Sequence, residues 1–207
     1  MMLSISSSIA LIELLGVLAF AFTGIIEARK KGMDLIGVYT VSMIAAFGGG
    51  TIRDLLIGNY PLYWIEHSAY AMILFGFALA SASLGAAFYD NPKVNNAFDV
   101  LDTLGLGLFC TAGASVAHQA GCDFYVSMLL GVVTAIFGGI SRDIICNEIP
   151  KVFHRNELYA TCAAVGSSVF LVGLQTGIGS LVAMLAGVFA TVLLRWLSVK
   201  YKIRLPL

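Results

Sequence analysis

Two short segments combine glycines with an arginine–aspartate pair inside an otherwise apolar chain. The first, GGGTIRD, runs from Gly48 to Asp54, and the second, GGISRD, runs from Gly138 to Asp143. Each glycine weakens a helix by about 1 kcal/mol relative to alanine, so we expect a kink or a short unwinding in both segments. Within a bilayer, carbonyl oxygens freed in this way are tolerated only where protein or water covers them. Such oxygens suit a passing cation.

The glycines and the hydroxyl residues beside them are therefore the candidates for lining a path that a cation follows through the protein. They are Gly48, Gly49, Gly50, Thr51, Gly138, Gly139 and Ser141. The alternative is that the glycines only allow neighbouring helices to pack closely. Three glycines in a row, and their recurrence in the second segment, favour the path.

Charged residues inside the apolar segments form the second candidate set: Glu13, Arg53, Asp54, Asp102, Arg142 and Asp143. Neighbouring residues on a helix point about 100° apart, so Arg53 is not expected to face Asp54. We expect Glu13 to pair with Arg53, and Asp102 with Arg142, with one pair at each mouth of a path. Because charges are costly in a bilayer, the alternative is that both pairs only lock helices together.

The composition predicts that these residues lie in a membrane. Of 207 residues, 59% are hydrophobic and 12% are charged, which is too apolar for a soluble domain of this size. Apolar segments long enough to cross roughly 30 Å of hydrocarbon recur along the whole chain. We predict an all-α membrane protein with one transmembrane domain, residues 1–207, and seven spans: 8–28, 33–59, 68–89, 98–118, 124–146, 157–175 and 178–197.

The positions of lysine and arginine predict the orientation of these spans. With seven spans, ten of the twelve basic residues fall on one side: Arg29, Lys30, Lys31, Lys93, Lys151, Arg155, Arg195, Lys200, Lys202 and Arg204. Basic residues accumulate on the cytoplasmic side of short loops. We therefore expect an outside N-terminus and a cytoplasmic C-terminus in the cell inner membrane, with anionic lipid headgroups as partners of the basic face.

The chain contains an internal repeat. A shift of 89 residues without a gap places Glu13 on Asp102 and aligns identical pairs, among them Gly16 with Gly105, Phe20 with Phe109, Gly49 with Gly138, Arg53 with Arg142, Asp54 with Asp143 and Pro61 with Pro150. Each copy holds three spans, about 8–89 and 98–175, and a seventh helix covers about 178–197. Because three is odd, the second copy enters the membrane from the opposite face. This predicts an inverted repeat with its functional centre near the midplane.

Several functional classes lack support in the sequence. The four cysteines are widely separated, without the spacing of a metal or redox motif, and we expect them to pack as small apolar residues. Serines such as Ser42, Ser141 and Ser167 lack a histidine and an acid at the spacing of a nucleophile site. The net charge is zero. We therefore expect no enzyme activity, cofactor or tight metal site, and no nucleic-acid partner.

The chain resembles the prokaryotic trimeric intracellular cation channels in three features. They are the segment GGGTIRD followed by Pro61 and Trp64, the matching segment GGISRD followed by Pro150, and the arrangement of two three-helix copies with one further helix. The resemblance implies a homotrimer with one pore per protomer, narrowed near kinks in the second and fifth helices. It also implies potassium-preferring conduction of monovalent cations, with potassium and sodium ions as the permeating partners. Phe137 stands opposite Gly48, so the second break is expected to be tighter. The alternative is a secondary transporter of a small solute such as glycine, because inverted repeats with broken helices also build carriers.

Overall fold

The structure is a computed structural model that describes residues 2–154 and 158–203. In this part of the chain every regular element is a helix. In chain order the elements are α1 (Met2–Lys30), α2 (Leu35–Ile57), α3 (Tyr63–Glu66), α4 (Ala69–Ser81), α5 (Ala86–Tyr89), α6 (Pro92–Gln119), α7 (Phe124–Ile145), the 3-10 turn η1 (Lys151–Phe153), α8 (Tyr159–Gln175) and α9 (Ser180–Tyr201). By length and composition α2, α6, α7 and α9 are able to cross a membrane, whereas the apolar helices α4 and α8 have 13 and 17 residues.

Several predicted boundaries need correction. The expected span 68–89 is divided into α4 and α5 by a turn, and α6 begins at Pro92, six residues before the expected start at 98. Asn91 explains the early start of α6, because its side chain caps the helix at the Lys93 amide and Pro92 occupies the first turn. Lysines and arginines expected in loops lie largely in helices, including Arg195 in α9. Arg155 and Arg204 lie outside the described residues.

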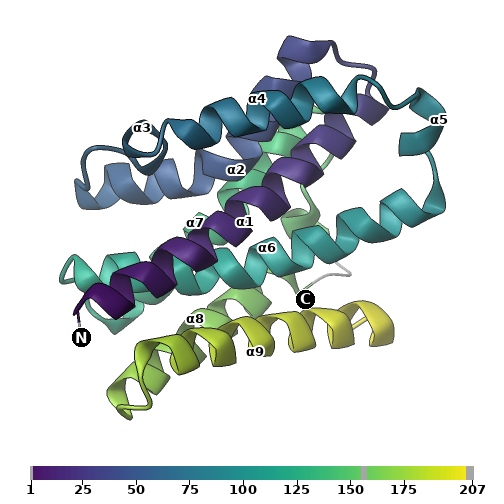
Figure 1. Cartoon of the computed structure of the whole chain (residues 1–207). Coiled ribbons are helices and arrows are strands. Elements are labelled where there is room, and N and C mark those ends of the chain that lie inside the picture. Colours follow the sequence, from purple (N-terminus) through teal and green to yellow (C-terminus); the bar gives the residue numbers. More distant parts are fainter. Residues whose placement is uncertain (1, 155–157, 204–207) are drawn as a thin grey trace.

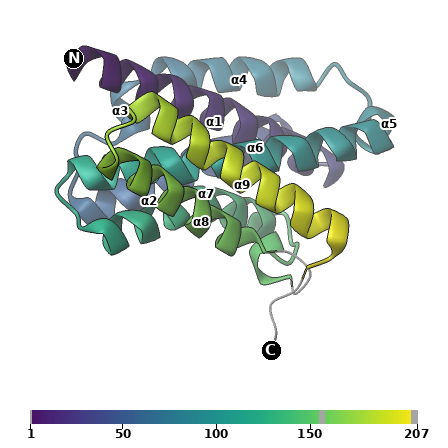
Figure 2. The same ribbon diagram turned by 90° about the horizontal axis from the view of Figure 1, so that it is seen from below.

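The helices form one bundle in which α4 and α9 lie at opposite edges (Figure 1). Between these edges α1 packs against α6, and α2 packs against α7. Helix α4 packs on α2, while α8 packs on α7 and is covered by α9, which runs across α6 and α8 in the second view (Figure 2). Four helices, α1, α2, α6 and α7, therefore make up the centre of the bundle.

Helices α2 and α7 begin and end in the same way, 89 residues apart. Asp34 caps α2 by accepting the Gly37 amide at 2.7 Å, and Asp123 caps α7 by accepting the Val126 amide at 2.8 Å. Each helix is followed by a residue in the left-handed region, Gly58 with φ 68° and Asn147 with φ 57°. Glycine and asparagine are the residues that adopt this conformation most readily at a helix end.

The central contact of the bundle is also made by matched residues. Phe20 of α1 and Phe109 of α6 are both buried, and their ring centroids are 5.2 Å apart. Gly16 lies against the Phe109 ring and Gly105 against the Phe20 ring, so a Cβ at either glycine would approach the facing ring to 2.8 Å. Because Gly16 and Gly105 have no side chains, α1 and α6 cross closely, and the pair of phenylalanine rings fills the space between them.

Helix α9 packs against its own protomer through small residues. Ala183 and Gly187 are both buried, Ala183 facing Gly173 and Gly187 facing the Gly166 carbonyl oxygen of α8. Gly179 precedes the helix, with φ 86°, and does not contribute to its packing face. Ala183 and Gly187 therefore serve contacts within one chain.

Candidate functional site

Glycines allow α2 and α7 to cross with their backbones in contact. A Cβ at Gly49 would overlap the Thr134 carbonyl oxygen, and a Cβ at Gly138 would overlap the Ala45 carbonyl oxygen. These contacts are related by the 89-residue shift, because Ala45 matches Thr134 and Gly49 matches Gly138. Both helices are continuous through their glycines, so the expected unwinding is absent. Close packing, the alternative weighed against a broken helix, accounts for Gly49 and Gly138.

The other glycines have room for a side chain. A Cβ at Gly48 would have its nearest contacts at 3.8 Å, and a Cβ at Gly50 would have only Nη2 of Arg53, also at 3.8 Å. A Cβ at Gly139 would lie 3.7 Å from the Tyr159 hydroxyl and 3.8 Å from Nη2 of Arg142. Gly50 and Gly139 therefore face the two arginines rather than a packed backbone.

Glu13, Arg53, Asp54 and Asn59 form the Arg53 site. Nη1 of Arg53 donates to Glu13 at 3.1 Å, and Nε donates to Asp54 at 2.9 Å. The Asn59 amide also donates to Asp54, at 3.2 Å. The expected Glu13–Arg53 pair is therefore present. The expectation that Arg53 does not face Asp54 is wrong, because the long arginine side chain bends back to its neighbour.

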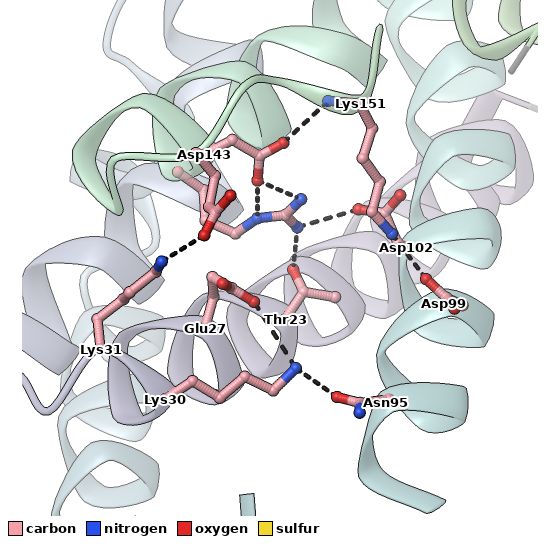
Figure 3. A network of polar contacts seen from close by, with 11 residues as sticks. Thr23, Glu27, Lys30, Lys31, Asn95, Asp99, Asp102, Asp143 and Lys151 are labelled. Atoms are coloured by element: carbon pink, nitrogen blue, oxygen red, sulfur yellow. Dashed lines mark hydrogen bonds and ion pairs between the residues drawn. The ribbon is translucent and has the colours of Figure 1, made fainter. Parts of the chain in front are cut away.

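Thr23, Asp102, Arg142 and Asp143 form the Arg142 site (Figure 3). Nη1 of Arg142 donates to Asp102 at 3.0 Å and to the Thr23 hydroxyl at 2.7 Å, and Nε donates to Asp143 at 2.8 Å. The expected Asp102–Arg142 pair is present, and again the arginine also binds the adjacent aspartate. Arg142 is 1% exposed and Arg53 is 2% exposed, so each site is a buried cluster of one guanidinium and two carboxylates.

The two sites differ in how closely they are filled. A cavity of about 20 Å³ adjoins the Arg53 site and is lined by Glu13, Gly50, Thr51, Arg53 and Tyr63, among others. This volume is enough for about one water molecule. The space beside Arg142, which Gly139 and Tyr159 also line, has essentially no free volume. Ser141, the other expected hydroxyl residue, is half-buried in α7.

The aspartate that follows each arginine also differs between the two sites, in how many of its carboxylate oxygens accept hydrogen bonds. Asp143 uses both carboxylate oxygens, because Oδ1 binds Arg142 and Oδ2 accepts the Lys151 amide at 3.2 Å. Oδ2 of Asp54 is buried and has no hydrogen-bond partner among the described residues. The Arg53 site thus retains an oxygen able to accept a further hydrogen bond or a cation, whereas the Arg142 site is closed.

Lysines surround the Arg142 site at the ends of the helices. Lys30 of α1 binds Asn95, Lys31 binds Glu148, and Lys151 binds Asp99 at 2.7 Å (Figure 3). Lys30, Lys151 and Arg142 also lie over the ring of Phe98, at 4.3–5.4 Å from its centroid. One buried aromatic ring therefore contacts Arg142 and two lysines beside this site.

The exposed Lys31–Glu148 pair yields a prediction about pH. The hydrogen bond from Lys31 lowers the pKa of Glu148 below its ordinary value of 4.5, and the same bond raises the pKa of Lys31 above 10.5. The contribution of Glu148 to stability is therefore present above pH 4.5 and is lost as the pH falls through its lowered pKa. We expect Lys31→Gln to return the pKa of Glu148 to its ordinary value, measured by carbon NMR titration of the labelled carboxyl. A pKa unchanged by the substitution would exclude the pair in solution.

Some residues in or beside the Arg142 site were not identified from the sequence. Tyr159 matches Tyr70 in the 89-residue shift, so the repeat carried a signal for it. Thr23 matches Ala112, and Phe98 matches Ile9, so the repeat gave no indication of either.

Comparison with known proteins identifies the family. A family model described as "Glycine transporter" matches residues 10–85 and 99–175, two segments whose first residues are 89 positions apart. A "UPF0126 membrane protein" of Vibrio cholerae is 32% identical over 203 residues, covering 97% of this chain and 83% of the relative. The "UPF0126 inner membrane protein YadS" of Escherichia coli is 30% identical, with coverage of 94% and 93%.

A solved structure described as the trimeric intracellular cation channel orthologue from Rhodobacter sphaeroides matches with a TM-score of 0.86 and 33% identity, covering 94% of this chain and 98% of that one. The chain belongs to the family of prokaryotic trimeric intracellular cation channels. The family resemblance found in the glycine and arginine–aspartate motifs is therefore confirmed. The all-helical architecture matches that of the channel structure, and the chain is a multi-pass membrane protein.

Proposed function

We propose that the protein is a channel for monovalent cations that prefers potassium, with one path in each protomer between α1, α2, α6 and α7. The observation that carries this proposal is the pair of buried arginine sites, which the 89-residue shift relates to each other across the α2–α7 crossing. One guanidinium and two carboxylates give each site a formal charge of −1, which attracts cations rather than anions. The similarity to a solved cation channel over almost the whole chain supports the same conclusion.

The proposal includes the arrangement of the path. Seven spans form two inverted repeats and an additional helix, with the N-terminus outside and the C-terminus in the cytoplasm of the cell inner membrane. The Arg53 site then faces the outside, and the Arg142 site faces the cytoplasm with its lysines near anionic lipid headgroups. The path passes Gly50 and Thr51 on one side and Gly139 and Ser141 on the other.

The proposal also includes assembly as a homotrimer. The Rhodobacter sphaeroides structure is described as trimeric, and this chain spans 98% of it. Each protomer encloses its own pair of sites, so the trimer does not complete the path.

A second candidate function is transport of a small solute such as glycine. The description of the matching family model favours it. A carrier exposes its site alternately to the two sides and saturates, whereas a channel passes ions at a rate set by the electric field.

The experiment is flux through the purified protein in liposomes, with potassium and labelled glycine measured in parallel. We expect potassium flux that follows the membrane potential and no uptake of glycine. Saturable glycine uptake without potassium flux would support the carrier and reject the channel.

A variant at Gly50 tests where the path lies. In Gly50→Leu the leucine side chain would enter the free volume beside Arg53, so this variant is expected to lower potassium flux at least tenfold. The matched control is Gly76→Leu in α4, where a Cβ meets nothing within 4 Å, and we expect unchanged flux. Equal flux in both variants would place the path elsewhere.

A further inference from the structure

Helix α9 contains a buried arginine in an apolar segment. Arg195 is 4% exposed and lies between Leu194 and Trp196 in the second half of the helix. A charge at such a position is costly in a membrane and is retained where it has a function. The Arg195 guanidinium lies over the ring of Tyr159, 4.8 Å from the ring centroid.

Tyr159 connects Arg195 to the Arg142 site. It begins α8 and is 3% exposed. It lines the space beside Arg142, and its hydroxyl lies 3.7 Å from the position of a Cβ at Gly139. One face of the ring thus meets Arg195, and the hydroxyl lies beside Gly139 in the space next to Arg142.

Tyr70, which the 89-residue shift matches to Tyr159, has a different support. Tyr70 stacks with Tyr63 and His67, with centroids 6.0 and 5.7 Å apart. Its helix, α4, lies at the edge of the bundle opposite α9 (Figure 1). The Arg53 site also retains free volume and a carboxylate oxygen without a hydrogen-bond partner among the described residues, whereas the space beside Arg142 is filled and both oxygens of Asp143 are used. The two ends of the path therefore differ, because α9 places the Arg195 guanidinium against Tyr159 and not against Tyr70.

We propose that Arg195 is a positioning residue that holds the Arg142 end of the path closed through Tyr159. The attraction between a guanidinium and an aromatic face is strongest where water is excluded, as it is around this buried pair. It holds the tyrosine hydroxyl beside Gly139, so the space beside Arg142 remains filled. Opening requires the ring to leave this position, and Arg195 shifts that equilibrium toward the closed state. This inference depends on the proposed channel function.

The test is potassium flux in liposomes of Arg195→Gln, with the trimer checked by mass in mild detergent. Because the closed position loses its support, we expect flux to rise at least threefold. Arg195→Lys keeps the charge without the planar group and is expected to give a smaller rise. Lys200→Gln is the matched control, because Lys200 is exposed on the same helix and lies over Trp196, and we expect wild-type flux.

A double-mutant cycle with Tyr159→Ala separates positioning from a general loss of packing. If Arg195 acts through Tyr159, the double variant has the flux of Tyr159→Ala alone. Unchanged or reduced flux in an intact Arg195→Gln trimer, or full additivity of the two substitutions, would overturn the proposal. If Arg195→Gln does not assemble, unchanged flux in Arg195→Lys overturns it instead. An absence of potassium flux in the wild type would reject the channel function itself and is thus a distinct outcome.

Discussion

Gly49→Ala is expected to destabilise the protein strongly, whereas Gly50→Ala one residue later is expected to leave its stability almost unchanged. The Cβ added at position 49 overlaps the Thr134 carbonyl oxygen, which belongs to the backbone of α7 and cannot rotate away. The helices must separate, and overpacking of this kind costs about 1–3 kcal/mol and in some cases more. The gain in helix propensity from alanine, about 1 kcal/mol, offsets only part of this cost.

At Gly50 the same substitution meets no packed backbone, because the nearest atom is Nη2 of Arg53 at 3.8 Å. The second helix offers a matched pair, with Gly138→Ala expected to be severe and Gly139→Ala mild. Thermal unfolding in detergent measures all four variants under one condition. Similar melting temperatures at positions 49 and 50 would show that α2 and α7 do not cross in backbone contact.

The sequence predicted the partners of the buried arginines because the 89-residue shift aligned them. Glu13 and Asp102 are the acidic residues that this shift places on matched positions of the first and fourth spans, and each binds the expected arginine. Residue types at fixed spacing were sufficient for this inference. The predicted starts of α2 and α7 were close to the observed ones, where Asp34 and Asp123 cap the helices, whereas the start of α6, capped by Asn91, was missed by six residues.

The roles of the glycines could not be predicted in the same way. A run of glycines weakens a helix, and it also permits close approach of a neighbouring backbone, and only the position of α7 distinguishes these two effects. The contact from Arg53 to Asp54 was also missed, because the rule about neighbouring positions describes Cβ directions and does not limit a long, flexible side chain. The role of Arg195 depends on how α9 packs, on which the repeat has no bearing.

Arg142→Gln is expected to be among the most destabilising substitutions in the chain. The guanidinium binds Asp102, Asp143 and the Thr23 hydroxyl, and its loss leaves two carboxylates buried without their cation. Removing one partner of a buried ion pair costs about 3–5 kcal/mol. The matched comparison is Lys31→Gln, which removes a lysine from an exposed pair and is expected to change the melting temperature little.

The pair itself is tested by a thermal-stability cycle of Arg142→Gln, Asp102→Asn and the double variant. Asp102→Asn leaves the guanidinium with Asp143 and Thr23, so it is expected to cost less than Arg142→Gln. In the double variant neither member of the pair keeps its charge, and Asp143 still accepts the Lys151 amide. The loss of stability is therefore expected to be smaller than the sum of the single losses. Strict additivity would mean that Asp102 and Arg142 do not stabilise each other, and that the closed Arg142 site depends on Thr23 and Asp143 alone.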